Sequence, residues 1–247
     1  MPFAAPMKPS PAMSSPMPPA IPTDPVPTLL LTRPDGASRR FATGVADLGL
    51  AVVIAPVLRI VAVEHDAARL AAARGLVFTS VHAVPAAGAG CGRPAICVGP
   101  ATAAAARAAG FDVTEGPGDA AGMMPLLAGL GAGWLHPHGT HLARVLPVPG
   151  MVVYDQAPQV LNNAARDLLA GTVPVLLPLF SPRSAALVAE QVRDAQAPLW
   201  LVPISPAADA AWDDAGGRAS RRVVAPRPDA GGIVAAIETL LNAKQSI

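Results

Sequence analysis

The chain has 247 residues, a net charge of +1 and 52% hydrophobic residues, which is enough apolar surface for one large folded domain or two small ones. Charged residues make up only 14% and no basic run occurs, so a nucleic-acid-binding surface is not expected. The only two lysines are Lys8 and Lys244, near the two ends. A Schiff-base lysine and a P-loop lysine are therefore excluded from the body of the chain.

Residues 1–27 contain ten of the 29 prolines. Because proline fixes φ and lacks an N–H, we expect this segment to be a disordered, polyproline-like tail. It has no uninterrupted apolar stretch typical of a signal peptide, and no stretch of about 18 apolar residues follows it. Cys91 and Cys97 are expected to be buried thiols. Together these features predict a cytoplasmic protein that binds neither membranes nor nucleic acid.

From residue 28 onward, short apolar runs alternate with alanine-rich stretches of helical periodicity. Such alternation predicts βαβ units with parallel sheets, so the expected fold class is α/β. Strands are expected at 28–32, 51–55, 76–79, 95–98, 152–155, 175–180 and 199–204. Helices are expected at 38–48, 82–87, 102–109, 184–195 and 233–242, with a further helix after Pro206.

The two halves of the chain also resemble each other. The equivalent pairs, separated by 101, 106 and 110 residues, are Ser80 and Ser181, Gly110 and Gly216, and Asp119 and Asp229. This repeat predicts two similar α/β domains with a cleft between them. In each half, strands end in small polar residues that start helices, and such turns present free N–H groups and the positive end of the helix dipole. We therefore expect a polyanionic, carboxylate-rich ligand in the cleft.

Several short motifs follow one another in a specific order. They are Leu29–Pro34 (LLLTRP), Phe78-Thr79-Ser80, Val98-Gly99-x-x-Thr102-Ala103, Gly139-x-x-x-x-Arg144, Val153-Tyr154, Phe180-Ser181-Pro182 and Ala225-Pro226-Arg227-Pro228. By these motifs the chain, from about residue 28 to 241, resembles the uroporphyrinogen-III synthase family. The resemblance implies a discontinuous first domain (28–60 with 156–242), an inserted second domain (61–155) and a two-stranded linker between them.

The resemblance also implies an activity. The family's enzymes are cofactor-free lyases of tetrapyrrole and haem biosynthesis, which dehydrate and cyclise hydroxymethylbilane and invert its last pyrrole ring to give uroporphyrinogen III. It further implies a monomer that receives its substrate from hydroxymethylbilane synthase. The alternative is a degenerate paralogue that binds a tetrapyrrole or another small polyanion without turning it over.

Tyr154, the only tyrosine, matches the family's tyrosine and is the expected catalytic residue. A phenol stays protonated at neutral pH and can donate a hydrogen bond to the departing hydroxyl group. The other interpretation is a structural core tyrosine whose hydroxyl is satisfied by the protein.

The expected substrate-binding residues are the hydroxyls and the glycine of the motifs together with one arginine: Arg33, Thr79, Ser80, Thr102, Gly139, Ser181 and Ser205. Ser80, Thr102 and Ser181 are equally suited to capping helices, and Arg33 to pairing with a structural acid. Ser205 and Ala208 stand where the family has Gly and Thr, so Ser205 is expected to replace the missing hydroxyl only in part.

Two histidine features have less specific interpretations. His136, His138 and His141 are close in sequence, but Pro137 and Gly139 interrupt any helix that would align them, so no metal site is expected. His82 is expected on a solvated loop.

Overall fold

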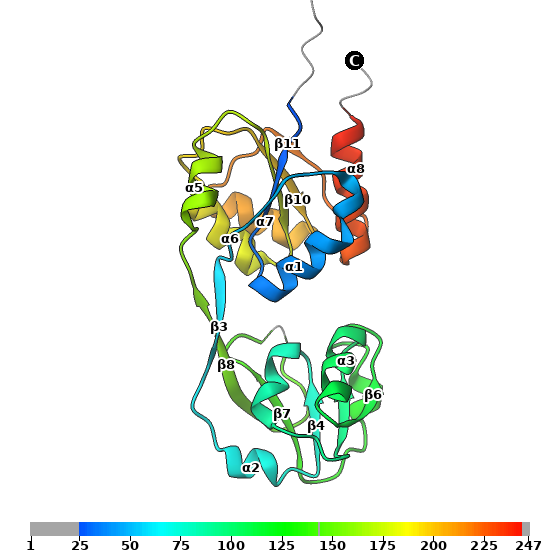
Figure 1. Ribbon diagram of the computed structural model, residues 1–247. Coiled ribbons are helices and arrows are strands. Elements are labelled where there is room, and N and C mark those ends of the chain that lie inside the picture. The colour runs from blue at the N-terminus through cyan, green and yellow to red at the C-terminus, as the bar shows by residue number, and fades with distance from the viewer. Residues whose placement is uncertain (1–24, 143, 244–247) are drawn as a thin grey trace, which may run out of the picture.

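The computed structural model of the protein describes residues 25–142 and 144–243. The predicted disordered tail, 1–27, therefore lies almost entirely outside the described residues. In the described part, the chain forms two α/β units, one above the other in Figure 1, which are connected by strands β3 and β8. The fold is α/β with parallel sheets, as the sequence predicts.

The first sheet has the order β11-β10-β9-β1-β2, and all its pairings are parallel. Its first strands therefore pair with strands from the C-terminal part of the chain, since β1 lies directly beside β9. The strands are β1 (Thr28–Leu31), β2 (Val52–Ile54), β9 (Val175–Leu179), β10 (Leu199–Pro203) and β11 (Arg221–Arg222).

The second sheet has the order β3-β8-β7-β4-β5-β6. Its pairings are parallel except that β3 and β8, which connect the two units, run antiparallel. The strands are β3 (Leu58–Ala62), β4 (Gly75–Phe78), β5 (Pro94–Cys97), β6 (Asp112–Glu115), β7 (Trp134–Gly139) and β8 (Gly150–Pro158).

Helices cover both faces of each sheet. In the first unit, α1 (Asp35–Gly44) and α8 (Ala230–Asn242) pack on one face, and α5 (Asn163–Leu169), α6 (Pro182–Gln191) and α7 (Pro206–Asp214) on the other. In the second unit, α2 (Ala67–Ala71) and α3 (Pro100–Ala108) face α4 (Met124–Leu127) across the sheet. The short 3₁₀ helices are η1 (Ala46–Leu48), η2 (Val81–Ala83) and η3 (Pro85–Ala87).

The apolar central strands contribute side chains to the hydrophobic core on both faces of the sheet. In β1, Leu30 joins the core cluster beneath α5, α6 and α7, whereas Leu29 and Leu31 join the cluster beneath α1 and α8. Side chains alternate between the two faces of a strand, so a strand covered on both sides must be apolar throughout. Three of the four edge strands of the described sheets, β3, β6 and β11, carry charged residues, as is common at sheet edges, whereas β2 carries none.

All seven predicted strands are found, and β8 is longer than predicted. The helix expected at 38–48 is instead α1 followed by η1, and the helix expected at 82–87 is two 3₁₀ turns. Cys97 is buried, but Cys91 is exposed, so the prediction of two buried thiols is wrong for Cys91. No helix in the described ranges is long and apolar enough to cross a membrane.

The two halves have matching local structure at the repeated residues. Asp119 and Asp229 each accept a hydrogen bond from the backbone N–H three residues later, both at 2.7 Å. Gly110 and Gly216 each follow a helix with a positive φ, 87° and 79°, the conformation that favours glycine after a helix C-terminus. The predicted domain boundaries at 60/61 and 155/156 fall inside β3 and β8, and this division remains a prediction.

Candidate functional site

Four of the predicted site residues line one hollow at the carboxyl ends of strands β4 and β7, beside the middle of β8. This strand-end hollow has a volume of about 390 Å³. It contains the predicted Thr79, Ser80, Gly139 and Tyr154. Its lining residues are Thr79, Ser80, Val98, Gly118, Asp119, Ala120, Gly139, His141, Leu142, Arg144, Tyr154 and Gln156. The carboxyl ends of parallel strands are where ligands bind in open α/β sheets.

Tyr154 reaches this hollow because the pairing of β7 with β8 is irregular. His138 pairs with Val152, but the next residue, Gly139, pairs with Tyr154, so Val153 is an extra residue in β8. Strict alternation would place Tyr154 and Val153 on opposite faces, yet both belong to the same core cluster. Such a bulge re-aims side chains, and here it turns the phenol toward the strand-end hollow.

The Tyr154 ring lies against the bare Cα of Gly139. A Cβ on Gly139 would be 2.6 Å from two ring carbons and 3.0 Å from the hydroxyl oxygen. Tyr154 is 5% exposed, and no hydrogen bond to its hydroxyl occurs among residues 25–142 and 144–243. The glycine thus makes room for the tyrosine ring, and the phenol is free to bond a ligand.

Thr79 is held by a buried histidine that is not among the site residues expected from the sequence. Thr79 Oγ1 lies 2.9 Å from His136 Nε2, and His138 Nδ1 donates to the carbonyl oxygen of Gly139 at 2.7 Å. Burial, with a smaller contribution from His138, lowers the pKa of His136 from 6.5 to about 4. His136 is therefore neutral at physiological pH and fixes the orientation of the Thr79 hydroxyl.

The three expected serines cap helices. Ser80 accepts a hydrogen bond from His82 N at 3.2 Å, Ser181 from Ser184 N at 3.1 Å, and Ser205 from Ala208 N at 3.3 Å. Ser80 also lines the strand-end hollow. Ser181 and Ser205 begin α6 and α7 at the carboxyl ends of β9 and β10, in the first unit.

Thr102 differs from the serines. The N-cap of α3 is Gly99, which offers no side chain, so the capping interpretation does not apply to Thr102. It lies in the first turn of α3, is 5% exposed and is not part of the strand-end hollow.

Arg33 follows β1, at the carboxyl edge of the first sheet. Its guanidinium lies 4.1 Å from the centre of the Phe180 ring, a cation–π contact. Burial, and to a lesser extent the charge of Arg40, lowers the pKa of Arg33. No acidic side chain pairs with Arg33 in the described parts of the chain, so the structural ion pair considered from the sequence is not formed there.

His82 is not on a solvated loop, which corrects the expectation from the sequence. It is partly buried in η2, its ring packs edge-on against Tyr154 with 5.8 Å between ring centres, and burial lowers its pKa. It also lines a second hollow of about 640 Å³, the inter-unit hollow, together with Pro34, Asp35 and Gly36 at the start of α1. Residues of both units therefore surround one space.

Two of the three closely spaced histidines, His136 and His138, lie buried in β7, whereas His141 is exposed. Their placement does not assemble a ligand set. Within residues 25–142 and 144–243, no group of three or more His, Cys, Asp or Glu side chains is arranged to hold a metal ion.

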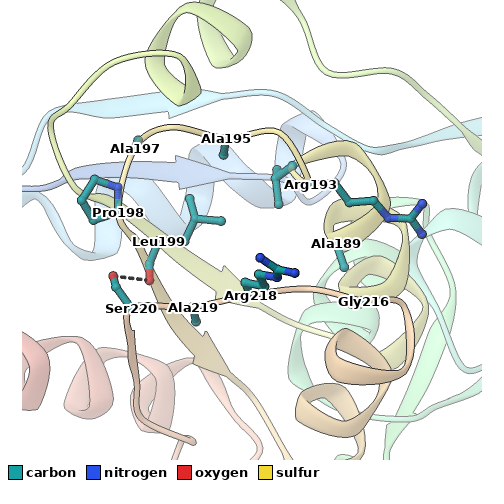
Figure 2. Close-up of a pocket in the computed structure, with 11 residues that line it drawn as sticks. Ala189, Arg193, Ala195, Ala197, Pro198, Leu199, Gly216, Arg218, Ala219 and Ser220 are labelled. Atoms are coloured by element: carbon teal, nitrogen blue, oxygen red, sulfur yellow. Dashed lines mark hydrogen bonds between the residues drawn. The ribbon is translucent and has the colours of Figure 1, made fainter.

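A further hollow of about 540 Å³ lies at the opposite edge of the first sheet, where β10 and β11 begin (Figure 2). Arg193 and Arg218 contribute side chains to it, and Ser220 donates to the carbonyl oxygen of Leu199 at 3.0 Å. This edge is away from the strand-to-helix turns and from every predicted site residue.

The arrangement can therefore do two things chemically. Hydroxyl groups, helix N-termini and Arg33 at the carboxyl edges of the two sheets can bind several carboxylates. A phenol without a partner among the described residues, Tyr154, can donate a hydrogen bond to a leaving group within the same region.

Comparison with known proteins gives a match to one sequence family and a similarity in fold to solved structures. The sequence profile of the family "Uroporphyrinogen-III synthase HemD" matches residues 39–235. The fold is similar to the crystal structure of uroporphyrinogen-III synthetase from Helicobacter pylori, with a TM-score of 0.59 and 14% identity over 87% of this chain and 99% of that one. The uroporphyrinogen III synthase of Thermus thermophilus aligns with a TM-score of 0.41 and 15% identity, covering 89% and 100% of the two chains. No curated protein sequence matches the chain significantly.

Proposed function

Since this chain belongs to the uroporphyrinogen-III synthase family, we propose that it dehydrates and cyclises hydroxymethylbilane with inversion of the last pyrrole ring, giving uroporphyrinogen III. The observation on which this rests is the family match over residues 39–235. The placement of Tyr154 and Thr79 in one hollow supports it. The reaction is that of a cyclising hydro-lyase in tetrapyrrole biosynthesis.

Two tasks follow from the chemistry of this substrate. Hydroxymethylbilane closes spontaneously to the type I isomer, so the protein must hold the chain in a conformation that favours the inverted closure. It must also assist the departure of the hydroxyl group, which needs a proton or hydrogen-bond donor. Neither task requires a cofactor.

Tyr154 is the catalytic residue in this proposal. Its hydroxyl has no bonding partner among the described residues and borders the strand-end hollow, so it can donate to the departing oxygen. Thr79 and Ser80 in the same hollow, oriented by His136 and by the first turn of η2, are placed to bind acetate or propionate groups.

The first unit supplies the complementary contacts. Arg33, together with the helix N-termini at Ser181 and Ser205, is placed to bind further carboxylates of the same molecule. Thr102 lies in the first turn of α3, outside the strand-end hollow, so any contact with the substrate would be at the edge of the site. Gly139 acts by giving space to the Tyr154 ring. We also propose that the protein is a cytoplasmic monomer that receives its substrate from hydroxymethylbilane synthase.

An isomer assay tests the function. Hydroxymethylbilane is generated in situ from porphobilinogen with a deaminase, the protein is added, and the products are oxidised and separated into type I and type III uroporphyrin. Mainly type III is the expected result. A product mixture identical to the protein-free control would refute the catalytic proposal and favour the alternative, a paralogue that binds a tetrapyrrole without turning it over.

A further inference from the structure

The hollow of about 540 Å³ where β10 and β11 begin, which we call the amino-edge hollow, takes no part in the proposed reaction. A largely apolar hollow of this size with a few polar groups is typical of a small-molecule site. Its floor consists of buried residues of the core cluster beneath α5, α6 and α7, namely Ala189, Val192, Ala197 and Leu199. A ligand with an apolar body would therefore be removed from water here.

Two arginines line the amino-edge hollow, and neither forms an ion pair with an acid in the described parts of the chain. Arg193 follows α6 and Arg218 follows α7, and both side chains are exposed. In Figure 2 their guanidinium groups lie toward one end of the hollow, while Pro198 and Ser220 lie toward the other. The hollow thus combines an apolar floor with one positively charged end.

The positive charge at this end exceeds what the two helices neutralise. Both α6 and α7 end at the hollow, and each helix C-terminus carries about half a negative charge, so two arginines leave an excess of roughly one positive charge. Among the described residues that line the hollow, none is acidic. Asp213 in the last turn of α7 pairs with Arg222 at 2.7 Å. The exposed Asp194 and Asp214 are not part of the lining.

The backbone acceptors around the hollow are already bonded. Ala215 O accepts a hydrogen bond from Arg193 Nη2 at 3.2 Å. Leu199 O accepts two, from the N–H of Ser220 at 2.8 Å and from its hydroxyl at 3.0 Å (Figure 2), which uses both lone pairs of that oxygen. The Arg218 guanidinium has no hydrogen-bond partner among the described residues. The groups still free at the arginine end are therefore donors, and a ligand must supply the acceptors.

We propose that the amino-edge hollow is a second ligand site, which binds a small monocarboxylate with its carboxylate on Arg193 and Arg218 and its apolar body on the floor. Arginine suits this ligand because its planar guanidinium can bond a carboxylate through two parallel hydrogen bonds. A single anionic group also matches the excess of roughly one positive charge. The hollow lies at the edge of the first sheet opposite the strand-to-helix turns, so this proposal does not depend on the proposed reaction.

The test uses the fluorescent dye anilinonaphthalene sulfonate, an apolar body with one anionic group, whose emission rises when it leaves water. With the full chain we expect saturable binding from which octanoate displaces the dye, whereas octylamine, the same carbon chain with a positive charge, does not. Arg193→Gln and Arg218→Gln should each weaken octanoate binding about tenfold, the usual order for one charge-assisted hydrogen bond. Ala195→Leu, which fills part of the hollow without changing its charge, should also weaken it. Arg107→Gln removes an exposed positive charge from α3 in the other unit and is the matched control.

Both arginine variants are expected to fold because the two side chains are exposed, and circular dichroism checks this. The proposal is wrong if octanoate does not displace the dye from the wild type, or if octylamine displaces it equally well. It is also wrong if Arg193→Gln and Arg218→Gln both bind octanoate within twofold of the wild type. Type I product alone in the isomer assay would refute the proposed reaction and leave the second ligand site unaffected.

Discussion

Replacement of Gly139 by alanine would test the geometry of Tyr154 directly. The added Cβ would lie 2.6 Å from two carbons of the Tyr154 ring and 3.0 Å from its hydroxyl oxygen. Ordinary contacts between carbon atoms are about 3.5–4.0 Å, so the ring has to move by roughly 1 Å. Gly139 has no positive φ, so the substitution brings no backbone strain with it, and the effect comes from the displaced ring.

A displacement of this size should be costly for the reaction. Misplacing a catalytic group by about 1 Å lowers rates by up to about 100-fold. Some of the closure should also shift to the spontaneous route, so the type III fraction should fall. Tyr154 is largely buried, and overpacking of a core by one methyl group typically costs about 1–3 kcal/mol of unfolding free energy.

The assay is the initial rate of type III formation, together with the type III to type I ratio, at a temperature where circular dichroism shows the variant to be folded. Gly131→Ala is the matched control, because no atom lies within 4 Å of the Cβ it would add. A folded Gly139→Ala protein that forms type III product at the wild-type rate would contradict the placement of Tyr154 at the reacting centre.

Three further variants test the roles of Tyr154, His136 and Ser181. Tyr154→Phe keeps the ring but removes the donor, and should lower kcat by about 10²–10⁴-fold, the usual range for general-acid assistance, with uroporphyrin III binding retained; unchanged kcat would leave the structural interpretation of Tyr154. In the folded protein the pKa of His136 is about 4, below the ordinary value of 6.5. Between these two pH values the unfolded chain binds a proton that the folded protein does not, so the unfolding free energy should fall by about 3 kcal/mol as the pH is lowered from 6.5 to 4. Measured by urea unfolding between pH 7 and pH 4, the unfolding free energy of His136→Gln should therefore decrease less than that of the wild type. An equal decrease in both proteins would show that His136 does not cause this pH dependence. Ser181→Ala removes the N-cap of α6 and should lower the unfolding free energy by about 1 kcal/mol, whereas an unchanged urea midpoint would show that the cap adds no stability.

Much of the fold follows from local patterns. Strands β1, β9 and β10 are predictable because each is an apolar run covered on both faces. The caps at Ser181 and Asp229 are predictable because their side chains bond a backbone N–H only three residues away. Interactions of such short range depend little on the rest of the chain.

Strand β7 is absent from the strands predicted by the sequence, for a physical reason. It contains Pro137, and proline within a central strand removes a ladder hydrogen bond. The structure accommodates it because β4 pairs with β7 only at Trp134 and Leu135, so Pro137 lies beyond that ladder. The length of the pairing is a tertiary property, and without β7 the sequence gives no reason to expect His136 and His138 to be buried.

The sequence by itself determined the α/β class, the repeated turns, the family and the importance of its single tyrosine. Only the tertiary structure decided which side chains accompany that tyrosine. The bulge opposite Gly139 turns Tyr154 toward the strand-end hollow, and the approach of the two units places His82 in one hollow with Pro34 and Gly36 of the first unit. Both depend on the register of strands and on contacts between residues more than ten positions apart, which a local pattern of residues does not encode.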